Sequence, residues 1–126
     1  MAIILVVDDQ KPVRDTIRIG LEMVGYDVIE AGDGAQGLQR LEEQRFDLII
    51  TDVVMPVMDG VAFVKTVRGR FPNLPILTIS GGGGALPAAY SLKMTEMFGA
   101  GGVLYKPFTP DELLESVQRL IGAPPS

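Results

Sequence analysis

Residues 3–9 read IILVVDD, a continuous apolar run that ends in the acidic pair Asp8 and Asp9. A run without polar alternation is typical of a strand that is buried on both faces of a parallel sheet. A second apolar run, at residues 46–51, ends at Asp52. We therefore predict a parallel sheet in which two strands end in carboxylates.

Strand-like and helical patterns alternate along the rest of the chain. Between Pro12 and Gly25, apolar residues recur every three or four positions, as on the buried face of a helix. We expect further strands at residues 26–30, 75–79 and 103–105, and helices at residues 12–24, 35–41, 63–67, 87–99 and 111–121. Strand–helix units of this kind are joined by right-handed crossovers. The predicted fold class is α/β, a doubly wound (βα)5 fold with a five-stranded parallel sheet and helices on both faces.

Composition narrows the chemistry that the chain can perform. It contains no Cys and no His, which excludes disulfides, iron–sulfur clusters and acid–base catalysis by His. Any bound metal must therefore be a hard ion held by oxygen atoms. The net charge of −5 makes the chain a poor binder of nucleic acid, because an acidic surface repels phosphates.

The length of 126 residues suits a single domain. We expect this domain to span residues 1–122 and to be followed by a short Pro-rich tail at residues 123–126. The apolar run at residues 2–7 is too short to cross a membrane and lacks the features of a signal peptide. We therefore expect a cytoplasmic protein without membrane contact.

Polar residues stand at the ends of four predicted strands. They are Asp8, Asp9, Asp52, Ser80 and Lys106. In parallel sheets the carboxyl ends of the strands form one edge, where ligands bind. Crowded carboxylates repel one another, and a bound Mg²⁺ relieves this repulsion and attracts a phosphoryl group. The residues therefore indicate a magnesium-dependent site that places a phosphoryl group on Asp52, with Lys106, the Ser80 hydroxyl and the Gly81 backbone N–H binding its oxygens.

The chain resembles the receiver domains of bacterial two-component response regulators, which have a flavodoxin-like fold. The resemblance covers residues 3–121 and depends on motifs in a constant order. These are Asp8-Asp9, Asp52, Met55-Pro56, Met58-Asp59-Gly60, Ser80-Gly81 and Lys106-Pro107-Phe108. Each motif is weak alone, but the whole series at these spacings is specific.

The resemblance implies a stand-alone receiver that takes its phosphoryl group on Asp52 from a phosphohistidine. The donor would be a sensor histidine kinase or a histidine phosphotransfer protein, and the signal would pass to an unidentified downstream protein without direct contact to nucleic acid. Asp8, Asp9, Asp52 and the backbone carbonyl of Val54 would hold Mg²⁺, or Mn²⁺ in its place. Such a domain catalyses only its own phosphorylation and dephosphorylation, and its Lys106–Pro107 bond would be cis.

The sequence departs from the receiver pattern at the residues that usually form the switch. Many receivers carry Tyr or Phe three residues before the lysine, where this chain has Val103, and the nearest aromatic residue is Tyr105. We assign Ser80, Val103 and Tyr105 to the switch. In the family that ring changes rotamer when the Ser or Thr moves toward the phosphate. The glycine run at residues 81–84 lies in a segment, residues 80–106, that is longer than in the commonest receivers. We therefore expect ordering of residues 81–87 on phosphorylation to replace part of this ring movement. In this family the positions of Val54 and Gly82 tune the lifetime of the phosphate. Neither residue has a polar side chain to position attacking water, which predicts slow dephosphorylation.

Three alternatives stay open at this stage. The chain could be the receiver of a longer regulator with DNA-binding or enzymatic output. A haloacid-dehalogenase-like phosphatase also uses Asp, Mg²⁺, Ser and Lys, but it would need a second acid where Val54 stands. A flavodoxin-like cofactor binder shares the sheet, but Asp8 and Asp9 would repel its phosphate. Whether Gln10, Lys11 and Arg14 contact a kinase or only solvent is not decided by the sequence.

Overall fold

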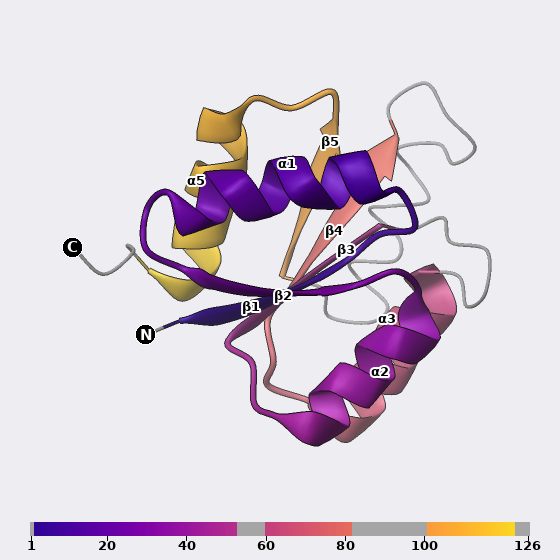
Figure 1. The fold of residues 1–126 in the computed structure, drawn as a ribbon. Coiled ribbons are helices and arrows are strands. Elements are labelled where there is room, and N and C mark those ends of the chain that lie inside the picture. Colours follow the sequence, from indigo (N-terminus) through magenta and orange to yellow (C-terminus); the bar gives the residue numbers. More distant parts are fainter. Residues whose placement is uncertain (1, 53–59, 82–100, 123–126) are drawn as a thin grey trace.

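The computed structural model describes residues 2–52, 60–81 and 101–122, which form a parallel sheet with helices on both faces (Figure 1). The strands are β1 (Ile3–Val7), β2 (Asp27–Ala31), β3 (Leu48–Asp52), β4 (Ile76–Gly81) and β5 (Gly102–Lys106). They lie in the order β2-β1-β3-β4-β5, and every neighbouring pair is parallel. The predicted α/β class with a five-stranded parallel sheet is confirmed.

Four helices cover the sheet within the described residues. They are α1 (Lys11–Glu22), α2 (Gly34–Glu43), α3 (Gly60–Arg70) and α5 (Pro110–Ile121). Helices α1 and α5 lie together on one face, and α2 and α3 lie together on the other (Figure 1). The helix expected at residues 87–99 lies outside the described residues, as does the tail at residues 123–126. In the part of the chain that the structure describes, no helix combines the length and the apolar character that a membrane crossing requires.

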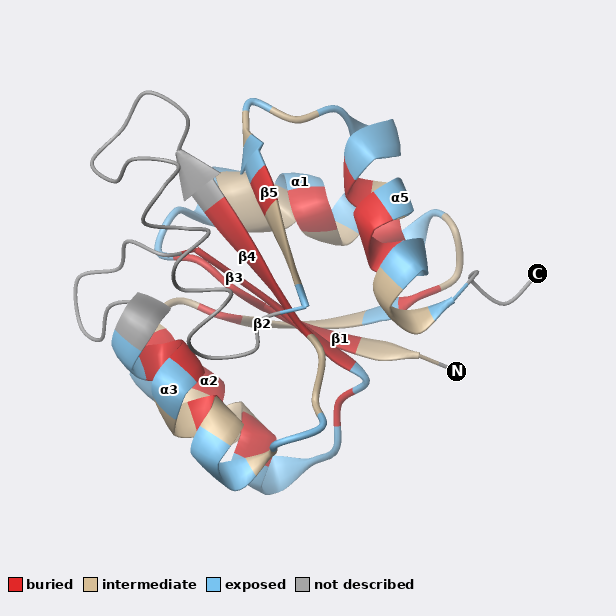
Figure 2. Ribbon diagram, turned by 180° about the vertical axis from the view of Figure 1, so that it is seen from behind, coloured by how far each residue is buried: buried red, intermediate tan, exposed pale blue. Residues whose placement is uncertain are grey.

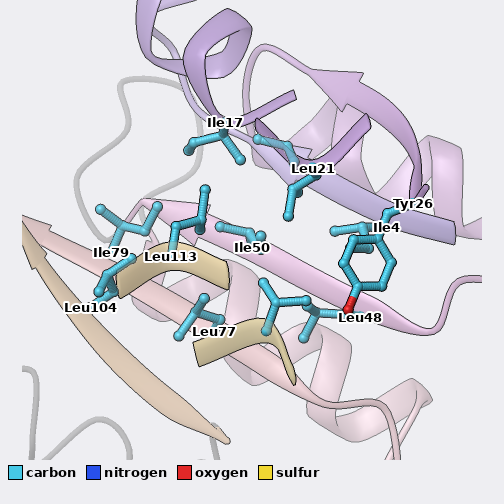
Figure 3. Close-up of a cluster of buried hydrophobic side chains, with 12 residues drawn as sticks. Ile4, Ile17, Leu21, Tyr26, Leu48, Ile50, Leu77, Ile79, Leu104 and Leu113 are labelled. Carbon is cyan, nitrogen blue, oxygen red and sulfur yellow. The ribbon is translucent and has the colours of Figure 1, made fainter. Parts of the chain in front are cut away.

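The apolar run of β1 is buried on both faces of the sheet, as its lack of alternation predicts. Ile4 and Val6 belong to the core cluster beneath α1 and α5, which Figure 3 shows in close-up. Leu5 and Val7 belong to the cluster beneath α2 and α3. Figure 2 shows buried residues along the central strands and on the inner sides of the helices.

Several element boundaries differ from the prediction by one or two residues. Helix α1 ends at Glu22 rather than near residue 24, because the N–H groups of Val24 and Gly25 bond back to Leu21 and Glu22 in a turn. Gly25 has a φ of 103°, which is the left-handed conformation that favours glycine. The second strand therefore starts one residue later than expected.

The third strand also starts later, at Leu48, because the preceding Asp47 makes two hydrogen bonds to Ile3 at the amino end of the sheet. Its backbone N–H donates to the carbonyl of Ile3, and its Oδ2 accepts from the N–H of Ile3, both at 2.8 Å. At the carboxyl end of the sheet, strands β3, β4 and β5 extend further than predicted. Asp52, Gly81 and Lys106 are the last residues of β3, β4 and β5. Strand pairing therefore holds the backbone of these candidate site residues in place.

Candidate functional site

Three carboxylates meet at the carboxyl edge of the sheet. Asp8 and Asp9 follow β1, and Asp52 ends β3, which is the neighbour of β1. One carboxylate oxygen from each residue lies within 4.8 Å of the others. Asp8 is 1% exposed and Asp52 is 7% exposed, whereas Asp9 is open to solvent. The structure thus brings together the acidic residues that the strand-end pattern predicts, and the cluster is accessible to solvent at Asp9.

Asp8 is the most constrained member of this cluster. Its Oδ1 accepts a hydrogen bond from the N–H of Gln10 at 2.8 Å, and its own N–H donates to the carbonyl of Ala31 at 3.1 Å. Its Oδ2 is buried and has no hydrogen-bond partner. The pKa of Asp8 is raised from 3.8 to about 6, mainly by burial and also by the charge of Asp52, while the bond from Gln10 opposes the rise. A buried acceptor without a partner costs free energy, and a cation ligand would satisfy it.

Lys106, the last residue of the edge strand β5, brings a positive charge to the same cluster. Its Nζ lies 3.2 Å from Asp52 Oδ2, and its side chain is 29% exposed. The charge of Lys106 also lowers the pKa of Asp8. The Lys106–Pro107 peptide bond is cis, as the resemblance implies. Lys106 is therefore placed to neutralise negative charge that arrives at Asp52.

The remaining candidate residues are only partly described by the structure. The backbone of Ser80 pairs with Tyr105, and that of Gly81 pairs with Lys106, which places both at the correct edge of the sheet. The structure does not describe the Ser80 side chain. Residues 53–59, which include the Val54 carbonyl and most of the Met55-to-Gly60 motifs, lie outside the described residues, as does the glycine loop beyond Gly81.

Both residues assigned to the switch on β5 are described. Val103 is half-buried and pairs with Thr78, and Tyr105 is 37% exposed. The structure therefore places Val103 and Tyr105 on the strand that carries Lys106.

The sequence did not decide the role of Arg14, and the structure places it at the site. Its Nη1 donates to the backbone carbonyl of Asp8 at 2.6 Å, and its Nε donates to Glu30 Oε1 at 3.2 Å. No motif marks this residue. The available signal is its position on the first turns of the helix that follows Asp8 and Asp9, because a long side chain there can reach back to the preceding loop.

The donor set fits a hard divalent cation. All the available groups are carboxylate oxygens, three of them converge, and one is buried and unsatisfied. An ionised Asp52 is also a nucleophile, with a neighbouring ammonium to offset the charge of an incoming anion. The arrangement can therefore hold a cation and a phosphoryl group side by side at the end of β3.

Comparison with protein families finds a match over residues 4–118 to the family described as response regulator receiver domain. Among curated proteins, the chain is 34% identical over 118 residues to the alkaline phosphatase synthesis transcriptional regulatory protein PhoP of Bacillus subtilis. It is 36% identical over 118 residues to the response regulator MprA of Mycobacterium tuberculosis. Each match covers 94% of this chain but only 48% and 50% of those two proteins, so the chain spans about half the length of the curated relatives that it matches.

Solved structures give the same result. The chemotaxis protein CheY4 of Vibrio cholerae superposes with a TM-score of 0.86 at 38% sequence identity, and the match covers 95% of this chain and 98% of that one. A response regulator receiver domain protein from Clostridium thermocellum superposes with a TM-score of 0.86 at 27% identity, with 96% and 94% of the two chains covered.

Proposed function

The chain belongs to the response regulator receiver domain family, and from this premise we propose that Asp52 is its phosphoacceptor. Receiver domains are signalling domains of two-component systems rather than classical enzymes. The observation that carries the proposal is the contact between Lys106 Nζ and Asp52 Oδ2 at the edge where Asp8 and Asp9 also lie. Family membership also removes the phosphatase and flavodoxin-like alternatives.

The proposed step transfers a phosphoryl group from a phosphohistidine to Asp52. A carboxylate oxygen of Asp52 attacks the phosphorus, the new O–P bond forms as the N–P bond breaks, and the imidazole of the donor leaves. Asp52 ends a central strand, which supports this role because its pairing with Ile79 on β4, and the pairing of the preceding Thr51 with Val7 on β1, limit the movement of its backbone. The reaction then needs charge compensation more than acid–base catalysis, which is consistent with a chain that has no His.

Asp8, Asp9 and Asp52 would hold Mg²⁺, with Mn²⁺ as the alternative ion and the Val54 carbonyl as a further ligand. When bound, the ion supplies positive charge that offsets the charge of the phosphoryl oxygens. The unpartnered Oδ2 of Asp8 supports this assignment, because a cation would satisfy it. Within the described residues, these are the residues whose ligand atoms converge in this way.

Lys106, the Ser80 hydroxyl and the Gly81 N–H would bind the phosphoryl oxygens. Lys106 already contacts the attacked carboxylate, and its register partner is Gly81. Movement of Ser80 toward the phosphoryl group would be passed on to Val103 and Tyr105, which lie on the adjacent strand. We assign the output to changes at this end of the sheet and in residues 81–87.

The partners follow from the family rather than from the site. A sensor histidine kinase or a histidine phosphotransfer protein would supply the phosphoryl group in the cytoplasm, and a downstream protein would recognise the phosphorylated domain. The domain itself would span residues 1–122. A receiver within a longer regulator is a second candidate, favoured by the curated relatives, of which the chain spans about half. The length of the native protein in its cell, measured by intact mass, distinguishes the two.

Incubation with Mg²⁺ and acetyl phosphate tests the proposal, with intact mass as the readout. We expect the mass to increase by one phosphoryl group, and we expect EDTA or the Asp52→Asn substitution to prevent the gain. A matched control is Asp47→Asn, which lies at the opposite end of the sheet beside Ile3 and should leave the gain unchanged. A wild-type protein that neither gains mass nor binds beryllofluoride with Mg²⁺ would refute the proposal.

A further inference from the structure

The side chain of Arg14 connects three elements next to the acidic cluster. Its side chain is only 16% exposed, although it stands on the first turns of α1. Its Nη1 donates to the carbonyl of Asp8 in the loop after β1, and its Nε donates to Glu30 on β2. Glu30 also forms an ion pair with Arg18, whose Nε lies 3.1 Å from its other carboxylate oxygen. Glu30 therefore anchors the guanidinium that binds the backbone of Asp8.

The contact with Arg14 completes the set of bonds that define the conformation of Asp8. The N–H of Asp8 is bound to Ala31, its Oδ1 is bound to the N–H of Gln10, and its carbonyl is bound to Arg14. The remaining polar atom, Oδ2, is the buried oxygen without a partner. At 2.6 Å the bond from Arg14 is short, as is typical of a charged donor.

We propose that Arg14 is a positioning residue for the cation site, holding the backbone of Asp8 so that its carboxylate stays beside those of Asp9 and Asp52. This inference rests on the proposed function, because it assumes that the cluster binds Mg²⁺. Ligand oxygens that are already oriented do not have to be ordered when the ion binds. Arg14 thus acts through Asp8 and does not itself contact the ion.

The sign of the effect separates this role from a simple effect of charge. A positive guanidinium beside a cation site repels the ion, so removal of the charge alone would strengthen Mg²⁺ binding. Loss of the positioning bond has the opposite consequence. Lysine at this position keeps the charge but has a compact ammonium instead of a planar fork, so it cannot reproduce the two fixed bonds to Asp8 and Glu30.

The experiment is a Mg²⁺ titration of the purified chain, followed by amide NMR shifts of Asp9, Gln10 and neighbouring residues. We expect Arg14→Gln to raise the Kd for Mg²⁺ by about ten-fold, the lower end of the range for loss of a group that orients a metal ligand. Arg14→Lys should raise the Kd at least as much, because it keeps the repelling charge and loses the two fixed bonds. The matched control is Arg18→Gln, which removes the other guanidinium bound to Glu30 but no contact with Asp8, and should leave the Kd unchanged.

Two results would overturn the inference. An unchanged or lower Kd for Mg²⁺ in Arg14→Gln would show that Arg14 acts only through its charge or not at all. An equal loss of Mg²⁺ affinity in Arg18→Gln would show that the ion pairs of Glu30 support the site in general and that the bond to Asp8 has no special role. If Arg14→Gln does not fold, as judged from its amide spectrum, Arg14→Lys alone decides the question by the same criterion. Failure of the proposed cation site is a separate outcome, seen when the wild type does not respond to Mg²⁺ or when Asp9→Asn responds like the wild type.

Discussion

Lys106 Nζ lies 3.2 Å from Asp52 Oδ2, although the two residues end strands that are separated in the sheet by β4. The lysine therefore extends across the end of β4 to reach the carboxylate. Its charge also acts on Asp8, whose pKa it lowers against the larger effect of burial. The ammonium of Lys106 thus interacts electrostatically with both buried carboxylates of the site, Asp8 and Asp52.

The first prediction concerns this influence. Lys106→Met should raise the pKa of Asp8 above its value of about 6, because the substitution removes an opposing charge and leaves the burial unchanged. Carboxyl ¹³C NMR in the absence of divalent cations measures this pKa. The control is Lys11→Met, which removes an exposed ammonium paired with Asp15 and should leave Asp8 unaffected. An Asp8 pKa that is equal in all three proteins would refute the proposed electrostatic link.

The second prediction is a pH dependence of stability that belongs to Asp8. Because its folded pKa of about 6 lies above the ordinary value of 3.8, the folded state keeps a proton that the unfolded state has released in this window. Raising the pH from about 3, below the unfolded pKa, to about 7, above the folded pKa, should therefore lower the free energy of unfolding relative to Asp8→Asn, by on the order of 3 kcal/mol. Urea unfolding in EDTA, followed by circular dichroism, measures the difference, and a flat or rising difference would contradict the account.

The third prediction is that bound Mg²⁺ offsets the loss of stability caused by the buried Asp8 carboxylate. An ion that binds only the folded state stabilises it by mass action, so Mg²⁺ at one hundred times its Kd should add about 2.7 kcal/mol to the free energy of unfolding. Asp9→Asn should abolish the gain without harming the fold, since Asp9 is exposed. The same urea experiment at pH 7 with Mg²⁺ in place of EDTA provides the measurement. A gain that persists in Asp9→Asn would place the ion elsewhere.

The fourth prediction tests the packing that supports β1. A Cβ added at Gly37 on α2 would lie 2.9 Å from Phe63 Cε1 and 3.1 Å from Val7 Cγ2, and both side chains are buried. Gly37→Ala should therefore cost about 1–2 kcal/mol, since the strain of overpacking exceeds the gain in helix propensity.

The matched control for this prediction is Gly20→Ala on α1. A Cβ at Gly20 meets nothing within 4 Å, so the substitution should stabilise the protein by about 0.5–1 kcal/mol. Thermal or urea unfolding compares the two variants. Equal changes of the same sign would show that the close approach at Gly37 does not limit the packing of α2 against β1 and α3.

The sheet and the acidic edge of the site could be predicted because both follow from local sequence. Unbroken apolar runs such as residues 3–7 predict strands buried on both faces, and the residues that follow them must lie at one edge. The orphaned Oδ2 of Asp8 could not be predicted, because it depends on how deeply the loop after β1 is buried. The contact between Arg14 and the Asp8 carbonyl depends likewise on the meeting of α1 with β2, which no spacing in the sequence encodes.

The most direct test of the central claim is to identify the residue that carries the phosphoryl group. Wild-type protein treated with acetyl phosphate and Mg²⁺ is reduced with borohydride, which converts an aspartyl phosphate to homoserine, and the peptides are analysed by mass spectrometry. The account predicts homoserine at position 52, absent when EDTA is added. Modification at Asp8 or Asp9 instead, or modification at position 52 that does not depend on Mg²⁺, would contradict the assignment of Asp52 as the phosphoacceptor of a magnesium-dependent receiver.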